Sequence, residues 1–293
     1  ITSGGGLSTL ETASKFPIRL VVSGPAGGAI LASKVSSQIG SNASLSFDMG
    51  GTTAKLCLID SSEPRISRQF EVDRSYRFKK GSGLPLKIPV IEMLEIGAGG
   101  GSIAHVDKMD RIKVGPESAG SSPGPACYDL GGNQPTVTDA DLLQGKMVIK
   151  NFPFFLNTDL GRVAINKIIS ENLGISDIDS ALGITEVVDE NMASAAKTHA
   201  AENGLDLGDR DIIAFGGAAP IHAANLGSKL KAKRILIPKN AAVGSALGFL
   251  LAAASHEVVR SRHMNLLEIN FEVINKLYEE MRGEALAIVT LAA

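Results

Sequence analysis

The stretch SFDMGGTTAKLCLID, residues 46–60, constrains the fold most, because it places one acidic residue and a tight glycine turn between two short apolar segments. Residues 45–47 and 55–59 favour two β-strands around that turn. Gly50 and Gly51 can take φ values that are closed to other residues, which would let backbone N–H groups face an anion at close range. The stretch therefore predicts either a phosphate-binding loop or a plain hairpin.

The order of the glycine-rich passages favours the phosphate loop. A helix rich in small residues, with Gly27, Gly28, Ala29 and Ala32, precedes the first strand, and the strand and turn FGGAAP at 215–220 opens another helix. A second small-residue helix is predicted at 241–254. This order resembles the second half of the actin-like ATPase fold of actin, sugar kinases and heat-shock chaperone ATPases, in which two such helices cross between the lobes.

The resemblance implies specific roles for the two turns. Asp48 would be the catalytic carboxylate and would hold a hydrated Mg²⁺ rather than the phosphate itself. FGGAAP would contact the adenosine, where missing side chains let a flat purine or ribose lie against backbone. Lys55 could face a phosphate or solvent, and solvent is favoured. The implied nucleotide-binding residues are Gly50, Gly51, Thr52, Thr53, Gly216, Gly217 and Ala218.

The remaining patterns predict an α/β fold of the actin-like, ribonuclease-H-like kind, with a five-stranded mixed sheet flanked by helices. Residues 68–78 favour a third strand, and helices over 157–174 and 184–204 should stop at Gly174 and Gly204. Residues from about 80 to 157 form a loop-rich insertion in this interpretation. Thr138 or Asp139 is the expected N-cap of a short helix inside that insertion.

Three passages narrow the resemblance to one family. EIGAGGGSIAHVD at 95–107, the stretch from Val114 to Gly145, and FGGAAPIHAA at 215–224 are similar to the large ATP-dependent subunits of hydantoinases and 5-oxoprolinases. Relatives of that family include caprolactamase and the acetone and acetophenone carboxylases. The resemblance implies an ATPase domain over residues 1–255 and a C-terminal helical segment over 256–293. Because Ile1 is not a start methionine, we expect a piece of a longer polypeptide.

The family resemblance implies ATP-dependent opening of a cyclic amide, such as a hydantoin, 5-oxoproline or another lactam, through a phosphorylated intermediate. It also implies Mg²⁺ and two partners, an N-terminal lobe with the first phosphate-binding loop and a hydantoinase B-type subunit or domain. The chain alone is therefore expected to be inactive. An ATP-dependent ketone carboxylase subunit and a nucleotide-gated scaffold without its own chemistry are the alternatives.

Four further polar residues are candidates for binding a metal or substrate: Glu95, His105, Asp107 and His222. His105 and Asp107 are two apart on a predicted strand, which places them on one face. A structural contact is the favoured interpretation of that pair. His222 follows Pro220 in the first turn of a helix, where a hydrogen bond within the core is favoured over a catalytic role.

Composition excludes other classes of partner. A net charge of −2, from 29 basic and 31 acidic residues, supplies no basic field for nucleic acid or an anionic membrane surface. The apolar run at 241–254 is shorter than the roughly 20 residues of a membrane span. Cys57 and Cys127 have no metal-ligand spacing, which favours reduced thiols in a cytoplasmic protein.

Overall fold

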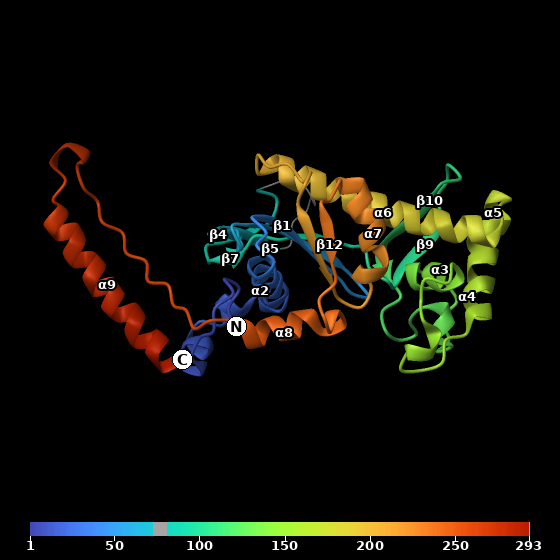
Figure 1. The fold of residues 1–293 in the computed structure, drawn as a ribbon, viewed down its shortest axis with the longest axis horizontal. Coiled ribbons are helices and arrows are strands. Elements are labelled where there is room, and N and C mark those ends of the chain that lie inside the picture. The colour runs from blue at the N-terminus through green and yellow to red at the C-terminus, as the bar shows by residue number, and fades with distance from the viewer. Residues whose placement is uncertain (73–80, 293) are drawn as a thin grey trace. The chain divides into compact units, whose positions relative to one another are not determined.

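The structure is a computed structural model, which describes residues 1–72 and 81–292 (Figure 1). The chain packs into two compact units. The sheet unit comprises Ala32–Arg65 and Glu92–Ser245, and the terminal unit comprises Ile1–Leu31, Ile66–Ile91 and Ala246–Ala293. The chain passes between the units within helices α2 (Ser23–Gln38) and α8 (Gly244–Leu251).

A mixed sheet forms the centre of the sheet unit. Strand β11 is parallel to β1 and β12, whereas β2 is antiparallel to β1, β3 and β8. The mixed sheet flanked by helices confirms the predicted fold class, but it contains six strands where five were expected. Strands β3 and β8 were not predicted, since they span only two and three residues, too few for an alternating pattern to reveal them, and the strand predicted at 68–78 lies outside this sheet. The strands are β1 (Ala43–Met49), β2 (Ala54–Asp60), β3 (Glu63–Pro64), β8 (Leu94–Ile96), β11 (Asp211–Phe215) and β12 (Arg234–Leu236).

Helices bury the central strands. Helix α7 (Ala219–Leu230) packs against β1, β11 and β12, and the long α6 (Asp177–Glu202) packs against α7 and β8 (Figure 1). Phe47 on β1 and Phe215 on β11 are fully buried. Strands β1, β2 and β11 are buried over most of their length, although β1 alternates its apolar residues with Ser44, Ser46 and Asp48.

The predicted helix stops are confirmed. Helix α4 (Thr158–Ile165) continues through a π-helical turn, Asn166–Ser170, into α5 (Glu171–Leu173) and ends at Gly174, where φ is +65°. Helix α6 begins at Asp177, earlier than the predicted residue 184, because the Ser176 hydroxyl caps it. Gly204, with φ of +66°, lies just beyond its end.

The segment from 80 to 157 is more regular than the sequence indicated. It contains the hairpin β9 (Ser102–Val106) and β10 (Ile112–Ser118), the helix α3 (Val137–Leu143), and 3₁₀ turns at Ala126–Tyr128 and Ile149–Asn151. Thr136, and not Thr138 or Asp139, is the N-cap of α3. Asp139 completes a capping box as the third helical residue, so the cap lies up to one turn earlier than expected.

Among its described residues, the terminal unit contains two small antiparallel sheets of two strands each. Strand β4 (Ile66–Ser67) pairs with β7 (Val90–Ile91), and β5 (Phe70–Val72) pairs with β6 (Leu84–Leu86). The strand predicted over 68–78 is therefore represented by β5, since residues 73–80 lie outside the described part of the chain. This unit also includes α1 (Leu10–Lys15) and a 3₁₀ turn at Pro17–Leu20.

Small residues bring the terminal-unit parts of α2 and α8 into backbone contact. A β-carbon on Gly248 of α8 would overlap the carbonyl of Gly27 on α2. The sequence predicted that the small side chains of α2 would allow such a close approach, and the contact confirms it.

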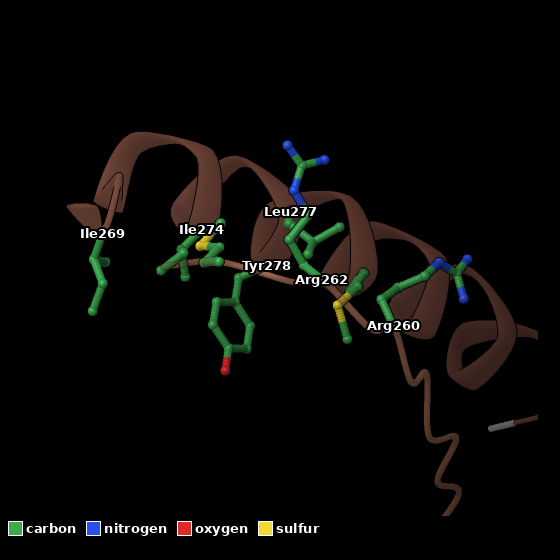
Figure 2. Close-up of a pocket in the computed structure, with 8 residues that line it drawn as sticks. Arg260, Arg262, Ile269, Ile274, Leu277 and Tyr278 are labelled. Atoms are coloured by element: carbon green, nitrogen blue, oxygen red, sulfur yellow. The ribbon is translucent and has the colours of Figure 1, made fainter. Parts of the chain in front are cut away.

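The last helix, α9 (Phe271–Ala292), follows a 3₁₀ turn at Leu266–Glu268. Ile274 and Tyr278 line a cavity of about 390 Å³ beside α9, together with Arg260 and Arg262 from the preceding segment (Figure 2). Arg260 also forms an ion pair with Glu284 of α9 at 2.5 Å. Within residues 1–72 and 81–292, no helix is long and apolar enough to cross a membrane.

Candidate functional site

The two predicted nucleotide loops meet at one edge of the sheet. Asp48 at the end of β1 is in register with Phe215 at the end of the parallel strand β11. The Ala218 N–H donates to the Met49 carbonyl oxygen at 2.9 Å. Carboxyl ends of parallel strands are where open α/β sheets bind ligands. The structure therefore brings together Asp48, the 50–53 loop and the 216–218 loop, three parts separated by up to 170 residues.

The physical reason predicted for the glycines is wrong at two positions. Neither Gly50 nor Gly51 is among the residues with positive φ, and Gly217 is not among them either. Gly216 has the left-handed backbone, with φ of +96°. A β-carbon on Gly216 would lie 2.6 Å from Asp48 Oδ1 and 2.5 Å from the Met49 carbonyl oxygen. Gly216 is therefore required for the two strand ends to approach.

Gly50, Gly51 and Gly217 share a different property. A β-carbon at any of the three would meet no heavy atom within 4 Å, so each borders open space. Among the described residues, the N–H groups of Gly51, Thr52 and Gly217 donate no hydrogen bond. These N–H groups are exposed donors, and the acidic side chain of Asp48 lies next to them. Such a site suits an anion that binds together with a cation.

The GAGGGS passage, residues 97–102, forms backbone hydrogen bonds with the 50–53 loop. The N–H of Gly100 donates to the Gly50 carbonyl at 3.0 Å, and the N–H of Gly101 donates to the Gly51 carbonyl at 2.7 Å. A β-carbon on Gly99 would lie 2.6 Å from the backbone of Gly51 and Thr52. Sequence reasoning used this passage only as a family signature, although its three consecutive glycines already indicated a close backbone approach.

Asp48 is half-buried and holds one partner that the sequence analysis missed. The Ser245 hydroxyl, at the start of α8, donates to Asp48 Oδ2 at 2.7 Å. Burial raises the pKa of the Asp48 carboxyl, while the Ser245 hydrogen bond and the charge of Lys55 oppose that rise. The sequence offered one indication of this contact, a serine at the start of a helix of small residues. Because 197 residues separate Ser245 from Asp48 in the chain, the sequence pattern could not show that the two side chains meet.

Lys55 lies beside the loop and is mostly covered, with 22% of its side chain exposed, so the favoured solvent-facing position is not what the structure shows. Its Nζ donates to the Thr53 hydroxyl at 2.6 Å and lies 3.3 Å from Glu95 Oε1. Lys55 and Glu95 are paired across β2 and β8. Glu95 thus enters the site as the counter-ion of Lys55.

The other two candidates on the hairpin do not join this group. His105 is exposed on β9, opposite Lys113. Asp107 accepts hydrogen bonds from the N–H groups of Met109 and Arg111 and from the Arg111 side chain. The Arg111 side-chain hydrogen bond is the main reason that the pKa of Asp107 is lowered to about 2. The Asp107 carboxylate is therefore engaged in closing its own turn.

His222 lies in a buried ionic cluster of α3, α6 and α7. Its Nδ1 is 2.7 Å from Asp189 Oδ1, its Nε2 is 3.1 Å from Asp141 Oδ2, and all three side chains are at most 2% exposed. Burial alone would lower the pKa of His222, but the hydrogen bonds and charges of the two carboxylates raise it to about 9. Asn225 donates to Asp189 at 3.1 Å, and Lys146 lies 3.5 Å from Asp141.

A metal at this edge of the sheet would have few protein ligands. In the described residues, no three or more His, Cys, Asp or Glu side chains are arranged to hold a metal ion. Asp48, with the hydroxyls of Thr52 and Thr53 nearby in sequence, is an oxygen donor set of the kind Mg²⁺ uses when it keeps most of its waters and shares a substrate phosphate. The residues present fit a hydrated Mg²⁺ and do not fit a cage of protein ligands.

Comparison with known proteins decides the family. The hydantoinase/oxoprolinase family model matches residues 1–258. The chain belongs to the hydantoinase/oxoprolinase family. It is 33% identical to the caprolactamase alpha subunit of Pseudomonas jessenii over 96% of this chain and 40% of that protein. It is 32% identical to the acetophenone carboxylase gamma subunit of Aromatoleum aromaticum over 98% of this chain and 40% of that protein.

Two solved structures have a similar fold. The crystal structure of the ATP-dependent caprolactamase of Pseudomonas jessenii matches all of this chain and 42% of that chain, with a TM-score of 0.77 and 30% identity. Nucleotide-free acetone carboxylase matches all of this chain and 41% of that chain, with a TM-score of 0.80 and 26% identity. The fold is that of the actin-like ATPases, and the chain spans about two fifths of the length of these relatives.

Proposed function

We propose that the chain supplies one side of an ATP site in an enzyme that opens a cyclic amide, such as a hydantoin, 5-oxoproline or another lactam. One observation carries this proposal. Exposed N–H groups of Gly51, Thr52 and Gly217 have no acceptor among the described residues, and they lie in loops that meet beside the half-buried Asp48. Phosphate oxygens would accept from the first two, and the adenosine would lie against the bare backbone at Gly217.

Asp48 and the loop have separate tasks in this proposal. Mg²⁺ neutralises charge on the phosphates when it is bound. Asp48 would hold it through water, and Ser245 would keep the Asp48 carboxylate in place. Lys55 orients the Thr53 hydroxyl and keeps its own charge close to the loop. The N–H groups of the loop position the terminal phosphate, since phosphoryl transfer depends on positioning and charge stabilisation.

In this proposal ATP activates the amide by phosphorylating its oxygen. The amide oxygen would attack the terminal phosphorus, forming a new O–P bond while the bond to the departing ADP breaks. A first water would then add to the activated carbon, and the ring C–N bond would break to leave a free amine and an acyl phosphate. A second water would hydrolyse the acyl phosphate to a carboxylate and inorganic phosphate. Amide resonance opposes hydrolysis, and phosphorylation of the oxygen moves that cost into the ATP-consuming step.

The whole protein requires further parts in this proposal. The family relatives include proteins named as alpha, beta and gamma subunits, and the chain spans about two fifths of their length. We infer that an N-terminal lobe supplies a second phosphate-binding loop and that a hydantoinase B-type subunit or domain assists the attack of water.

Phosphate release in the whole protein, supplied with Mg²⁺ and ATP, tests this function. We expect release to rise at least tenfold with 5-oxoproline, hydantoin or caprolactam and not with acetone or acetophenone plus bicarbonate. Stimulation by a ketone alone would instead support the carboxylase, the second candidate, which the likeness to acetophenone carboxylase favours. ATP binding with no substrate-stimulated release by either panel would contradict both and support a nucleotide-gated scaffold.

Gly217→Val should weaken ATP binding by tenfold or more, as measured by calorimetry on the whole protein. A β-carbon on Gly217 would meet no heavy atom within 4 Å, so we expect the added bulk to affect a bound ligand rather than the fold. Gly216→Ala is the contrasting variant, because its β-carbon would clash with Asp48 and its φ is strained. We expect Gly216→Ala to lose thermal stability as well. A folded Gly217→Val protein with unchanged ATP affinity would exclude the adenosine from this loop.

A further inference from the structure

A cavity of about 470 Å³ lies in the terminal unit, between the first residues of the chain and the segments around residues 66–68 and 255–257. Its lining includes Arg19, Arg68 and His256, and one carboxylate, Glu257. This volume is within the roughly 300–1,000 Å³ typical of small-molecule sites. We propose that the cavity binds a small organic monocarboxylate through the guanidinium of Arg19.

Arg19 carries the charge that such a ligand would neutralise. Within the described residues, its guanidinium has no carboxylate at ion-pair distance and instead lies over the ring of Phe16, 5.4 Å from the centroid. The Arg19 carbonyl accepts hydrogen bonds from the N–H and the hydroxyl of the fully buried Ser3. The base of the side chain is thus fixed while its five donors remain available.

The charge balance favours a monoanion. Arg68 and Glu257 form an ion pair at 2.9 Å and cancel each other. Burial and then the charge of Arg19 lower the pKa of His256, against a smaller opposing effect of Glu284, so His256 is neutral near pH 7. One positive charge remains in excess, which matches a carboxylate better than the dianion of inorganic phosphate.

The rest of the lining suits a ligand with a charged end and an apolar body. Ile66 and Pro89 provide apolar surface. The hydroxyls of Ser8 and Ser255 also line the cavity, and in the part of the chain that the structure describes they have no hydrogen-bond partner. A planar guanidinium can bind both carboxylate oxygens at once, which leaves the hydroxyls to bind further polar atoms.

Backbone hydrogen bonds between two segments hold the wall of the cavity in place. The Leu7 N–H donates to the Ala253 carbonyl at 2.9 Å, and the Ser255 N–H donates to the Leu7 carbonyl at 3.1 Å. A β-carbon on Gly6 would overlap the Ser255 hydroxyl, so the two segments lie in direct contact. A wall that is held by such contacts loses little conformational entropy when a ligand binds.

Calorimetry at low salt tests the site with three probes: cyclopentanecarboxylate, its neutral analogue cyclopentanecarboxamide, and inorganic phosphate. We expect the purified protein to bind the carboxylate at least tenfold more tightly than either other probe. No nucleotide and no cyclic amide is present, so the outcome is independent of the proposed ATP chemistry. Equal binding of the amide, preferential binding of phosphate, or no binding of the carboxylate would overturn the proposal.

Two substitutions of Arg19 test whether its positive charge binds the carboxylate. Arg19→Gln should weaken carboxylate binding at least tenfold, and Arg19→Lys should recover part of it, because the charge returns without the planar fork. Lys15→Gln is the matched control, since Lys15 also lies over Phe16, at 5.6 Å, but does not line the cavity. A folded Arg19→Gln or Arg19→Lys protein that binds as wild type does, or a Lys15→Gln protein that loses binding to the same extent, would contradict the assignment.

Discussion

Asp48→Asn should lower substrate-stimulated ATP hydrolysis in the whole protein by about 100-fold or more while leaving the fold intact. The substitution removes the carboxylate that would hold the hydrated metal, an interaction of several kcal/mol in the transition state, and about 3 kcal/mol corresponds to 100-fold in rate. Asn has nearly the same volume and is neutral, so burial at this half-buried position costs it less than it costs Asp48. Steady-state phosphate release measures the effect.

Ser245→Ala is the matched control for Asp48→Asn. It keeps the carboxylate and removes only the 2.7 Å hydrogen bond that orients it. We expect a loss of about tenfold, in line with the roughly 10- to 100-fold effect of removing a group that orients a metal ligand. ATP hydrolysis by Asp48→Asn within a factor of two of wild type would show that the phosphate-loop assignment is wrong.

His222→Gln should destabilise the protein by about 3–5 kcal/mol, measured by urea unfolding near pH 7. The substitution leaves two buried carboxylates, Asp141 and Asp189, without the cation between them. Removing one partner from a buried ionic cluster typically costs this much. Lys229→Gln is the control, because Lys229 pairs with the exposed Glu186 and Glu190 and such pairs contribute about 1 kcal/mol or less.

The pH dependence of stability separates the charge of His222 from its packing. Its pKa is about 9 in the folded protein, against the ordinary histidine value of 6.5 in an unfolded chain, so folding favours the protonated form. The stabilisation, about 3 kcal/mol by linkage, is complete below pH 6.5 and is lost as pH rises through 9. Wild type should therefore lose stability between about pH 7 and 10 more steeply than His222→Gln. Parallel stability curves over that range would mean that His222 is not charged in the fold.

The sequence by itself determined the features that depend on neighbours along the chain. The strands β1, β2 and β11, the helix stops at Gly174 and Gly204, and the small-residue helix α2 all follow from local periodicity and backbone preference. Asp48 and the loop after it could be singled out because the acidic residue and the glycine turn are adjacent in the chain. The hydrogen bond expected for His222 within the core follows from the same local view.

The tertiary structure alone decided the contacts between distant segments. The left-handed backbone belongs to Gly216 and not to Gly50 or Gly51, because β1 and β11 converge there and leave no room for a β-carbon. Ser245 reaches Asp48 from 197 residues away, and Gly99–Gly101 support the loop from another segment. Asp141 and Asp189 enclose His222 only after three helices pack. Periodicity carries no information about such partners, because it reports which face of an element is buried and not what lies against it.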